Sequence, residues 1–139
     1  MSFNEVKAIG DYKSELFAGK EYLIIAKSSD IIEKKGYKLA FSDDIDMQLA
    51  VFRIDNILYA LSNICPHRHA DRIFEGIIDR KNIVCPLHGW TYSLESGMNI
   101  HQNRGTKNLT KYDIFESNGT VYLEKPELQI PKWREQISL

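Results

Sequence analysis

The sequence lacks the features that mark a membrane protein or a nucleic-acid-binding protein. It has no apolar run of the length of a membrane-spanning helix, and its amino terminus is charged where a signal peptide would be apolar. Its 18 basic and 19 acidic side chains give a net charge of −1, so no basic excess predicts nucleic acid or an anionic membrane as a partner. We therefore expect a cytoplasmic protein with neither among its partners.

Cysteine is scarce, with only two residues in 139, and both stand in one short array. Cys65 precedes His67 with one residue between them, and Cys85 precedes His88 with two. The chain has only four histidines, so chance is a poor explanation for one behind each cysteine. Thiolate sulfur and imidazole nitrogen are both good ligands for iron, zinc and copper. The array predicts a metal site.

A proline and a glycine restrict the backbone around this array. Pro66 and Pro86 directly follow the two cysteines, where each fixes φ and removes an N–H group. Gly89 follows the second pair and permits a tight turn. We expect two rigid loops that converge on one centre. From the residues alone, a structural zinc site with two cysteines and two histidines, or a disulfide between the cysteines, remain alternatives.

Short apolar runs between turn residues predict a chain that is mostly β, since no segment shows apolar residues at helical spacing. The clearest hairpin spans Leu49 to Leu61 and turns at Asp55-Asn56, where both residues tolerate positive φ. Before it we expect strands at residues 5–10 and 21–27, then a polar loop from Ser28 to Met47 with a short strand near Tyr37 to Phe41.

After the cysteine of the first pair, the pattern predicts further short strands. These are Ile73 to Ile78, Asn82 to Val84 and Trp90 to Leu94, with a closing hairpin from Leu109 to Glu124. Asn118-Gly119 in that hairpin is the strongest short-range hairpin signal. The strands before and after residues 79–81 should bring the second loop back beside the first.

The pattern C-x-H, a spacer of 17 residues, then C-x-x-H-G-W resembles the signature of Rieske [2Fe–2S] domains. In that family two cysteines hold one iron and two histidines hold the other. The resemblance implies that Cys65 and Cys85 bind the inner iron and that His67 and His88 bind the outer iron. It implies a fold of three stacked antiparallel sheets with a small cluster-binding subdomain at one tip.

The resemblance also implies the extent of the domain and the tuning of the cluster. The domain would cover residues 1–125, with the cluster-binding subdomain at about 62–95, and residues 126–139 would form a carboxy-terminal tail. Tyr92 matches the position of a tyrosine that bonds a cysteine sulfur in related proteins, and Trp90 stands where high-potential members have serine. We expect both to shield and tune the cluster, at a potential low in the family's range.

As a function, the resemblance implies a one-electron carrier, a ferredoxin that passes electrons from a flavin-containing reductase to a terminal oxygenase. One alternative is a small subunit of a nitrite reductase-like enzyme or a split oxygenase, and another is a zinc-stabilised binding module. A complete oxygenase needs a second iron site, for which only His69 and His101 remain. We expect these two histidines at the surface, and we assign no catalytic residue.

Overall fold

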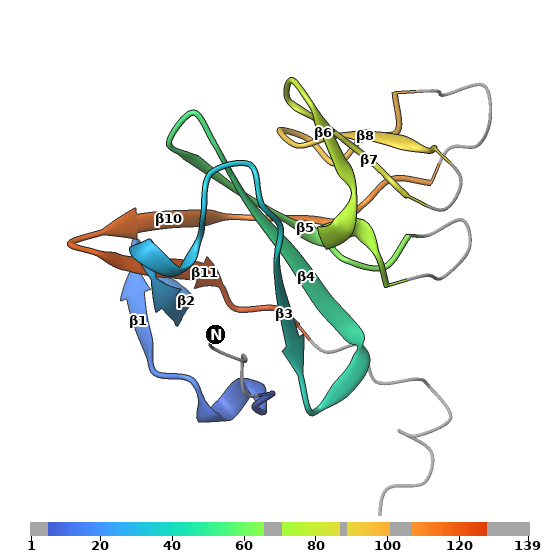
Figure 1. The fold of residues 1–139 in the computed structure, drawn as a ribbon. Helices are drawn as coiled ribbons and strands as arrows, with labels where there is room; N and C mark the ends of the chain where they lie inside the picture. The colour runs from blue at the N-terminus through green and yellow to red at the C-terminus, as the bar shows by residue number, and fades with distance from the viewer. Residues whose placement is uncertain (1–5, 66–70, 87–88, 101–106, 128–139) are drawn as a thin grey trace, which may run out of the picture.

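The computed structural model describes residues 6–65, 71–86, 89–100 and 107–127. Within these ranges the chain forms eleven strands in three antiparallel sheets, with three short 3-10 helices and no α-helix (Figure 1). None of these helices has the length and apolar character that a membrane crossing requires. The all-β prediction and its three antiparallel sheets are confirmed.

The first sheet, here called the base sheet, has the strand order β1-β2-β11-β10. Its turns carry residues of positive φ, among them Ala18 (52°) and Asn118 (51°), each followed by a glycine of positive φ. Such two-residue turns match the right-handed twist of the strands they join. The strands are β1 (Ser14–Phe17), β2 (Lys20–Lys27), β10 (Ile114–Ser117) and β11 (Thr120–Glu124).

The second sheet, here called the middle sheet, has the order β3-β4-β5-β9. The hairpin between β4 and β5 turns at Asp55 and Asn56, whose φ angles are 51° and 66°, as the sequence predicted. The side chain of Glu33 accepts hydrogen bonds from both of their N–H groups and holds this turn. The strands are β3 (Tyr37–Phe41), β4 (Asp44–Ile54), β5 (Ile57–Ser62) and β9 (Lys111–Tyr112).

The third sheet, here called the tip sheet, consists of three strands of three residues each, in the order β6-β7-β8. It lies beside the middle sheet, on the side away from the base sheet (Figure 1). Arg80 has a φ of 58° in the turn between its first two strands. The strands are β6 (Ile77–Asp79), β7 (Asn82–Val84) and β8 (Thr91–Ser93).

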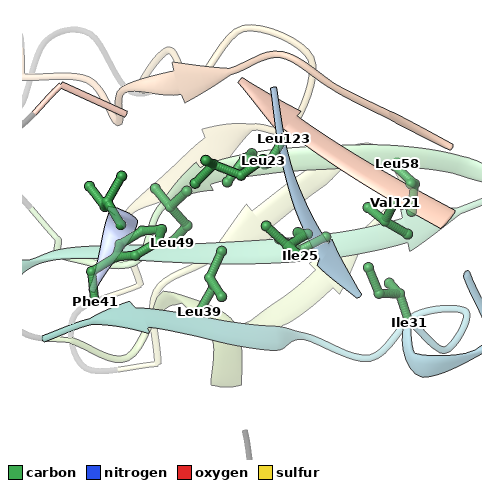
Figure 2. Close-up of a cluster of buried hydrophobic side chains, with 12 residues drawn as sticks. Leu23, Ile25, Ile31, Leu39, Phe41, Leu49, Leu58, Val121 and Leu123 are labelled. Atoms are coloured by element: carbon green, nitrogen blue, oxygen red, sulfur yellow. The ribbon is translucent and has the colours of Figure 1, made fainter. Parts of the chain in front are cut away.

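Around its central strands the middle sheet is buried on both faces, which explains the unbroken apolar run from Leu49 to Phe52 in β4. Successive side chains of a strand point to opposite faces, so alternate residues of β4 and β5 enter two different cores. Leu49 and Val51 lie in the base core, between the middle and base sheets (Figure 2). Phe52 and Leu61 lie in the tip core, between the middle and tip sheets. A register shift of one residue would exchange the two sets.

An ion pair joins the sheets at one end of the base core. The guanidinium of Arg53 on β4 donates to both carboxylate oxygens of Glu116 on β10, at 2.6 and 3.0 Å, and to the carbonyls of Ser28 and Ile31. The hydrogen bond from Arg53 is the main cause that lowers the pKa of the Glu116 carboxyl below its ordinary value. Bidentate geometry and partial burial make this pair stronger than a surface ion pair.

Two predictions at the amino-terminal side are wrong. In the described part of residues 5–10, Ile9–Asp11 forms a 3-10 helix because Ile9 is the one residue that enters the base core there. The strand that precedes β2 in the chain and forms a hairpin with it is β1, which begins at Ser14. The predicted loop from Ser28 to Met47 does contain β3, but β4 begins at Asp44 because its exposed end turns back onto Phe41.

Two predictions in the later half also need correction. Ile73–Glu75 is a 3-10 helix and not the start of a strand, since the N–H of Phe74 bonds to a side chain and not to a strand. The closing hairpin is formed by β10 and β11 alone. The residues before it, Lys111–Tyr112, pair with β5 of the middle sheet and so belong to another sheet.

Candidate metal centre

Cys65 follows the end of β5 and is fully buried in the tip core. Strand β5 reaches it through Ser62, whose hydroxyl accepts the N–H of Ile64, and Asn63, which is also fully buried. The hairpin of β4 and β5 therefore delivers the first cysteine to the interior beneath the tip sheet. The sequence prediction that this hairpin leads directly into the first loop is confirmed.

Cys85 follows β7 and begins a closed turn that ends where β8 begins. Its N–H donates to the carbonyl of Trp90 at 2.7 Å, and its carbonyl accepts the N–H of Gly89 at 3.0 Å. Gly89 has a φ of 70°, and a Cβ there would meet no atom within 4 Å, so the glycine is needed for backbone conformation and not for space. Cys85 is 1% exposed and lies in the same core as Cys65.

Tyr92 on β8 connects the tip sheet to the first cysteine. Its hydroxyl lies 3.5 Å from the Sγ atom of Cys65, and its ring is fully buried. Burial above all, then the hydrogen bond with Cys65 and the charges of both cysteines, raises the pKa of Tyr92 far above its ordinary value. The phenol therefore stays protonated and able to donate to a cysteine thiolate. The contact predicted for Tyr92 is present.

Trp90 is half-buried and packs against the tip core beside the second cysteine. Its carbonyl closes the Cys85 turn, so its position is fixed by the backbone as well as by its ring. The shielding of a cluster by Trp90 stays a prediction.

The structure brings the two cysteines together but does not describe the histidines. His67 and His88 lie outside the described residues, as do His69 and His101. The two cysteines are not joined in a disulfide, so the disulfide alternative is wrong. In the described ranges no group of three metal-ligating side chains occurs. The two sulfurs are the part of the predicted donor set that the structure places.

The two thiols fit the cysteine half of an iron–sulfur centre. They come from two separate loops, they share one water-poor core, and a protonated hydroxyl approaches one of the sulfurs. A thiolate buried without a cation would be costly, because burial penalises its charge. Two buried cysteines that are not joined in a disulfide therefore suit bonding to metal, where the ion compensates the charge.

Asn63 is a residue of this site that the sequence analysis missed. Its side-chain amide donates to the side chain of Gln48 and to the carbonyl of Asp71, and it accepts the N–H of Phe74 at 2.7 Å. A lone asparagine two residues before a cysteine has no periodicity that predicts burial. The one available signal was its position between an apolar strand and the cysteine.

The tip sheet has an apolar row on its outer face, next to the Cys85 turn. Ile77, Val84 and Thr91 are paired across the three strands, and the N–H of Ile100 bonds to the carbonyl of Thr91. Ile77 is 67% exposed and Ile100 is 47% exposed. The neighbouring row on the same face begins with Asp79 and Asn82 and is polar. The apolar row is thus the one nearer the cysteines.

The comparisons with known proteins agree with this geometry. The model of the Rieske [2Fe-2S] domain family matches residues 21–113. The oxygenase subunit of carnitine monooxygenase from Acinetobacter baumannii is 27% identical over 95 residues, which are 67% of this chain and 25% of that protein. The chain spans between a quarter and two fifths of the length of such oxygenase subunits.

Two smaller relatives match over most of their own length. The ferredoxin subunit of 3-phenylpropionate/cinnamic acid dioxygenase from Escherichia coli K12 is 27% identical over 86 residues, or 62% of this chain and 80% of that protein. A chain in the complex of reduced oxygenase and oxidized ferredoxin of carbazole 1,9a-dioxygenase has a TM-score of 0.64 and 27% identity, covering 73% of this chain and 99% of its own.

A third structure supports the fold alone. The Sphingomonas yanoikuyae B1 ferredoxin has a TM-score of 0.66 at 20% identity, over 76% of this chain and 99% of its own. The [2Fe-2S] cofactor that defines the matching family argues against the zinc alternative. Because the family match covers more than half of the chain and the fold agrees, the chain belongs to the Rieske [2Fe-2S] domain family.

Proposed function

We propose that this chain is a Rieske-type ferredoxin, which carries one electron at a time from a flavin-containing reductase to a terminal oxygenase. The observation that carries the proposal is the pair of buried cysteines, not joined in a disulfide, from two loops of one core, with the Tyr92 hydroxyl at 3.5 Å from one sulfur. When bound, a [2Fe–2S] cluster of this type takes up and releases a single electron.

The proposal assigns the ligands as the sequence predicted them. Cys65 and Cys85 hold one iron through sulfur, and His67 and His88 hold the other through nitrogen. Tyr92 donates to the sulfur of Cys65, and Trp90 covers the second loop. Residues 1–125 make up the domain, and residues 126–139 are a tail. Two cysteines that are not joined in a disulfide support a reducing compartment such as the cytoplasm.

Transfer to a second protein needs a surface that a partner can approach near the cysteines. The apolar row of the tip sheet supports such a contact, because Ile77 and Ile100 are exposed beside the Cys85 turn and carry no charge. Burial of this row against a partner would be favourable at about 25 cal/mol per Å² of apolar surface. The relatives that match over most of their own length support the same direction of transfer.

A second candidate is a cluster domain that works inside a larger oxidoreductase. The match to a quarter of the carnitine monooxygenase oxygenase subunit supports it, because there a domain of this type is part of a longer protein. In that case the cluster would relay electrons within a stable assembly, and not between proteins that meet transiently.

Anaerobic purification followed by reduction tests the proposal. We expect a red-brown protein with two irons and two sulfides per chain, which bleaches with dithionite and is then reoxidised by an added terminal oxygenase of a Rieske system. A colourless protein with one zinc would contradict the proposal. A stable complex on size-exclusion chromatography with the oxidoreductase would favour the second candidate over the ferredoxin.

A further inference from the structure

The loop that follows Cys65 has both of its ends tied together by one residue, Asn63. On the near side, Asn63 directly precedes the loop, at the end of β5. On the far side, its amide nitrogen donates to the carbonyl of Asp71 at 3.0 Å, and its amide oxygen accepts the N–H of Phe74 at 2.7 Å. The carbonyl of Asn63 also accepts the N–H of Ile73 at 3.3 Å.

Asn63 is in turn fixed to the middle sheet. Its N–H donates to the carbonyl of Gln48 on β4 at 2.8 Å, and its amide nitrogen donates to the side chain of Gln48 at 3.1 Å. Asn63 itself is fully buried, whereas its side-chain hydrogen bonds to Gln48, Asp71 and Phe74 are partly buried. Both amide hydrogens and the amide oxygen are thus used, and only one orientation of the amide fits these partners.

The backbone that follows the loop, around Phe74, is also packed tightly against two other parts of the chain. A Cβ at Gly36 would lie 1.9 Å from the carbonyl oxygen of Phe74, and one at Gly76 would lie 2.5 Å from the carbonyl oxygen of Val84. The backbone around Phe74 is therefore packed directly against the chain before β3 and against β7. Gly76 thereby links the end of this segment to β7, the strand that precedes Cys85.

We propose that Asn63 is a positioning residue, which sets where the first ligand loop stands relative to the second. It acts through the loop, because its amide has no donor left for a cluster sulfur. The hydrogen bonds of one asparagine join β4, the start of the Cys65 loop and its end, so the two described ends of that loop are fixed to one another and to the middle sheet. This inference rests on the ligand assignment made under the proposed function.

The test replaces the amide and follows the cluster itself. In Asn63→Ala, the N–H of Phe74 and the carbonyl of Asp71 lose a buried partner, and the loop loses its closure. We expect the rate at which a chelator such as EDTA bleaches the oxidised cluster to rise about tenfold. We also expect a broadened EPR signal after reduction, because the ligands no longer occupy a single arrangement.

A matched control separates positioning from general loss of stability. Val121 is fully buried in the base core and not in the tip core that holds the cysteines. Val121→Ala therefore removes packing but leaves the hydrogen bonds of Asn63 in place. Its bleaching rate should stay within about twofold of wild type although its unfolding midpoint falls. Gln48→Ala removes one partner of Asn63 and should give an intermediate rate, which also serves if Asn63→Ala does not fold.

The inference is overturned if Asn63→Ala, or Gln48→Ala in its place, keeps the wild-type bleaching rate and EPR line shape. It is also overturned if Val121→Ala loses its cluster as fast as Asn63→Ala or Gln48→Ala of equal stability. A wild-type protein that holds no [2Fe–2S] cluster would overturn the proposed function, and this inference with it. The readouts thus distinguish the two failures.

Discussion

The base core and the tip core of this protein share one sheet but are built from different materials. The base core is lined by aliphatic and aromatic side chains and is held at one end by the Arg53–Glu116 ion pair. The tip core also has aliphatic and aromatic side chains, two buried tyrosines among them, but it contains in addition two thiols that are not joined in a disulfide. The sheet above it has strands of only three residues. We infer that the base core is stabilised by the protein's own side chains alone, whereas the tip core also needs the metal that its two sulfurs bind.

The middle sheet connects the two cores, because each of its central strands, β4 and β5, contributes side chains to both. In β4 and β5 one set of alternating residues packs downward on the base sheet and the other packs upward on the tip sheet. The base can therefore hold the register of β5 while the tip forms around the metal. On this account, loss of the cluster should loosen the tip and leave the base folded.

The largest effect is expected from removal of a sulfur ligand. Cys65→Ser should abolish the iron and sulfide content, because serine oxygen is a poor replacement for a buried thiolate. In hydrogen exchange, amides of the tip sheet should lose protection while amides of β2 and β11 keep it. Equal loss of protection in both sheets would show that the base is not independent of the cluster.

A matched pair of leucines gives the next largest effect. Leu49 and Leu61 are both fully buried on neighbouring strands, but the first enters the base core and the second enters the tip core. Each change to alanine should lower the free energy of unfolding by about 3 kcal/mol. Only Leu61→Ala should also speed the loss of the cluster to a chelator, and equal speeds in the two variants would contradict the division into two cores.

A smaller effect on stability is expected at the ion pair of the base. Glu116→Gln should cost about 2 kcal/mol, since it removes a charged acceptor from Arg53. The pKa of Glu116 is lowered by Arg53, so its stabilisation is present above the unfolded pKa and is lost as the pH falls through the lower folded pKa.

Denaturant unfolding at a series of acidic pH values checks this expectation. Wild type should lose stability on acidification in the range below the ordinary pKa of glutamate, and Glu116→Gln should lose less over the same range. Since the pair lies at the base, the absorption spectrum of the cluster should be the same in both proteins. A changed spectrum would show that the Arg53–Glu116 ion pair affects the cluster, against the division into two cores.

The smallest effect is expected from removal of the Tyr92 hydroxyl, which lies beside the sulfur of Cys65. Tyr92→Phe keeps the ring in the tip core but removes the group that lies 3.5 Å from the Sγ atom of Cys65. A hydrogen bond worth about 1 kcal/mol more in the reduced state corresponds to about 40 mV for one electron, so the potential should fall by that amount. An unchanged potential with an intact fold would show that the contact does not tune the site.

Local turn chemistry explains which parts of the fold could be predicted. Asp55-Asn56 and Asn118-Gly119 specify two-residue turns of positive φ, and both hairpins occur where the sequence places them. The strand β1 was missed because its sequence, Ser-Glu-Leu-Phe, has no alternation and its turn begins with an alanine of positive φ. Alanine rarely adopts that conformation, so nothing local predicts it.

Tertiary contacts explain what could not be predicted. The helix Ile73–Glu75 replaces a predicted strand because the side chain of Asn63, eleven residues before Phe74, accepts the N–H of Phe74. The spacing of cysteine and histidine predicts four ligands, of which the structure describes the two cysteines, in one core with Tyr92 and with Trp90 packed against it. No spacing of residues predicts the role of Asn63. Its partner Gln48 lies on β4 and comes near only in the folded sheet.

The central claim is that two cysteines and two histidines divide one [2Fe–2S] cluster between them. Pulsed EPR of the reduced protein, grown with 15N-labelled histidine, measures this directly. The account predicts coupling to nitrogens of two histidines, which persists when His69 and His101 are both replaced and falls to one when His88 is changed to cysteine. A reduced cluster without histidine coupling, or coupling that is lost with His69 and His101, would contradict it.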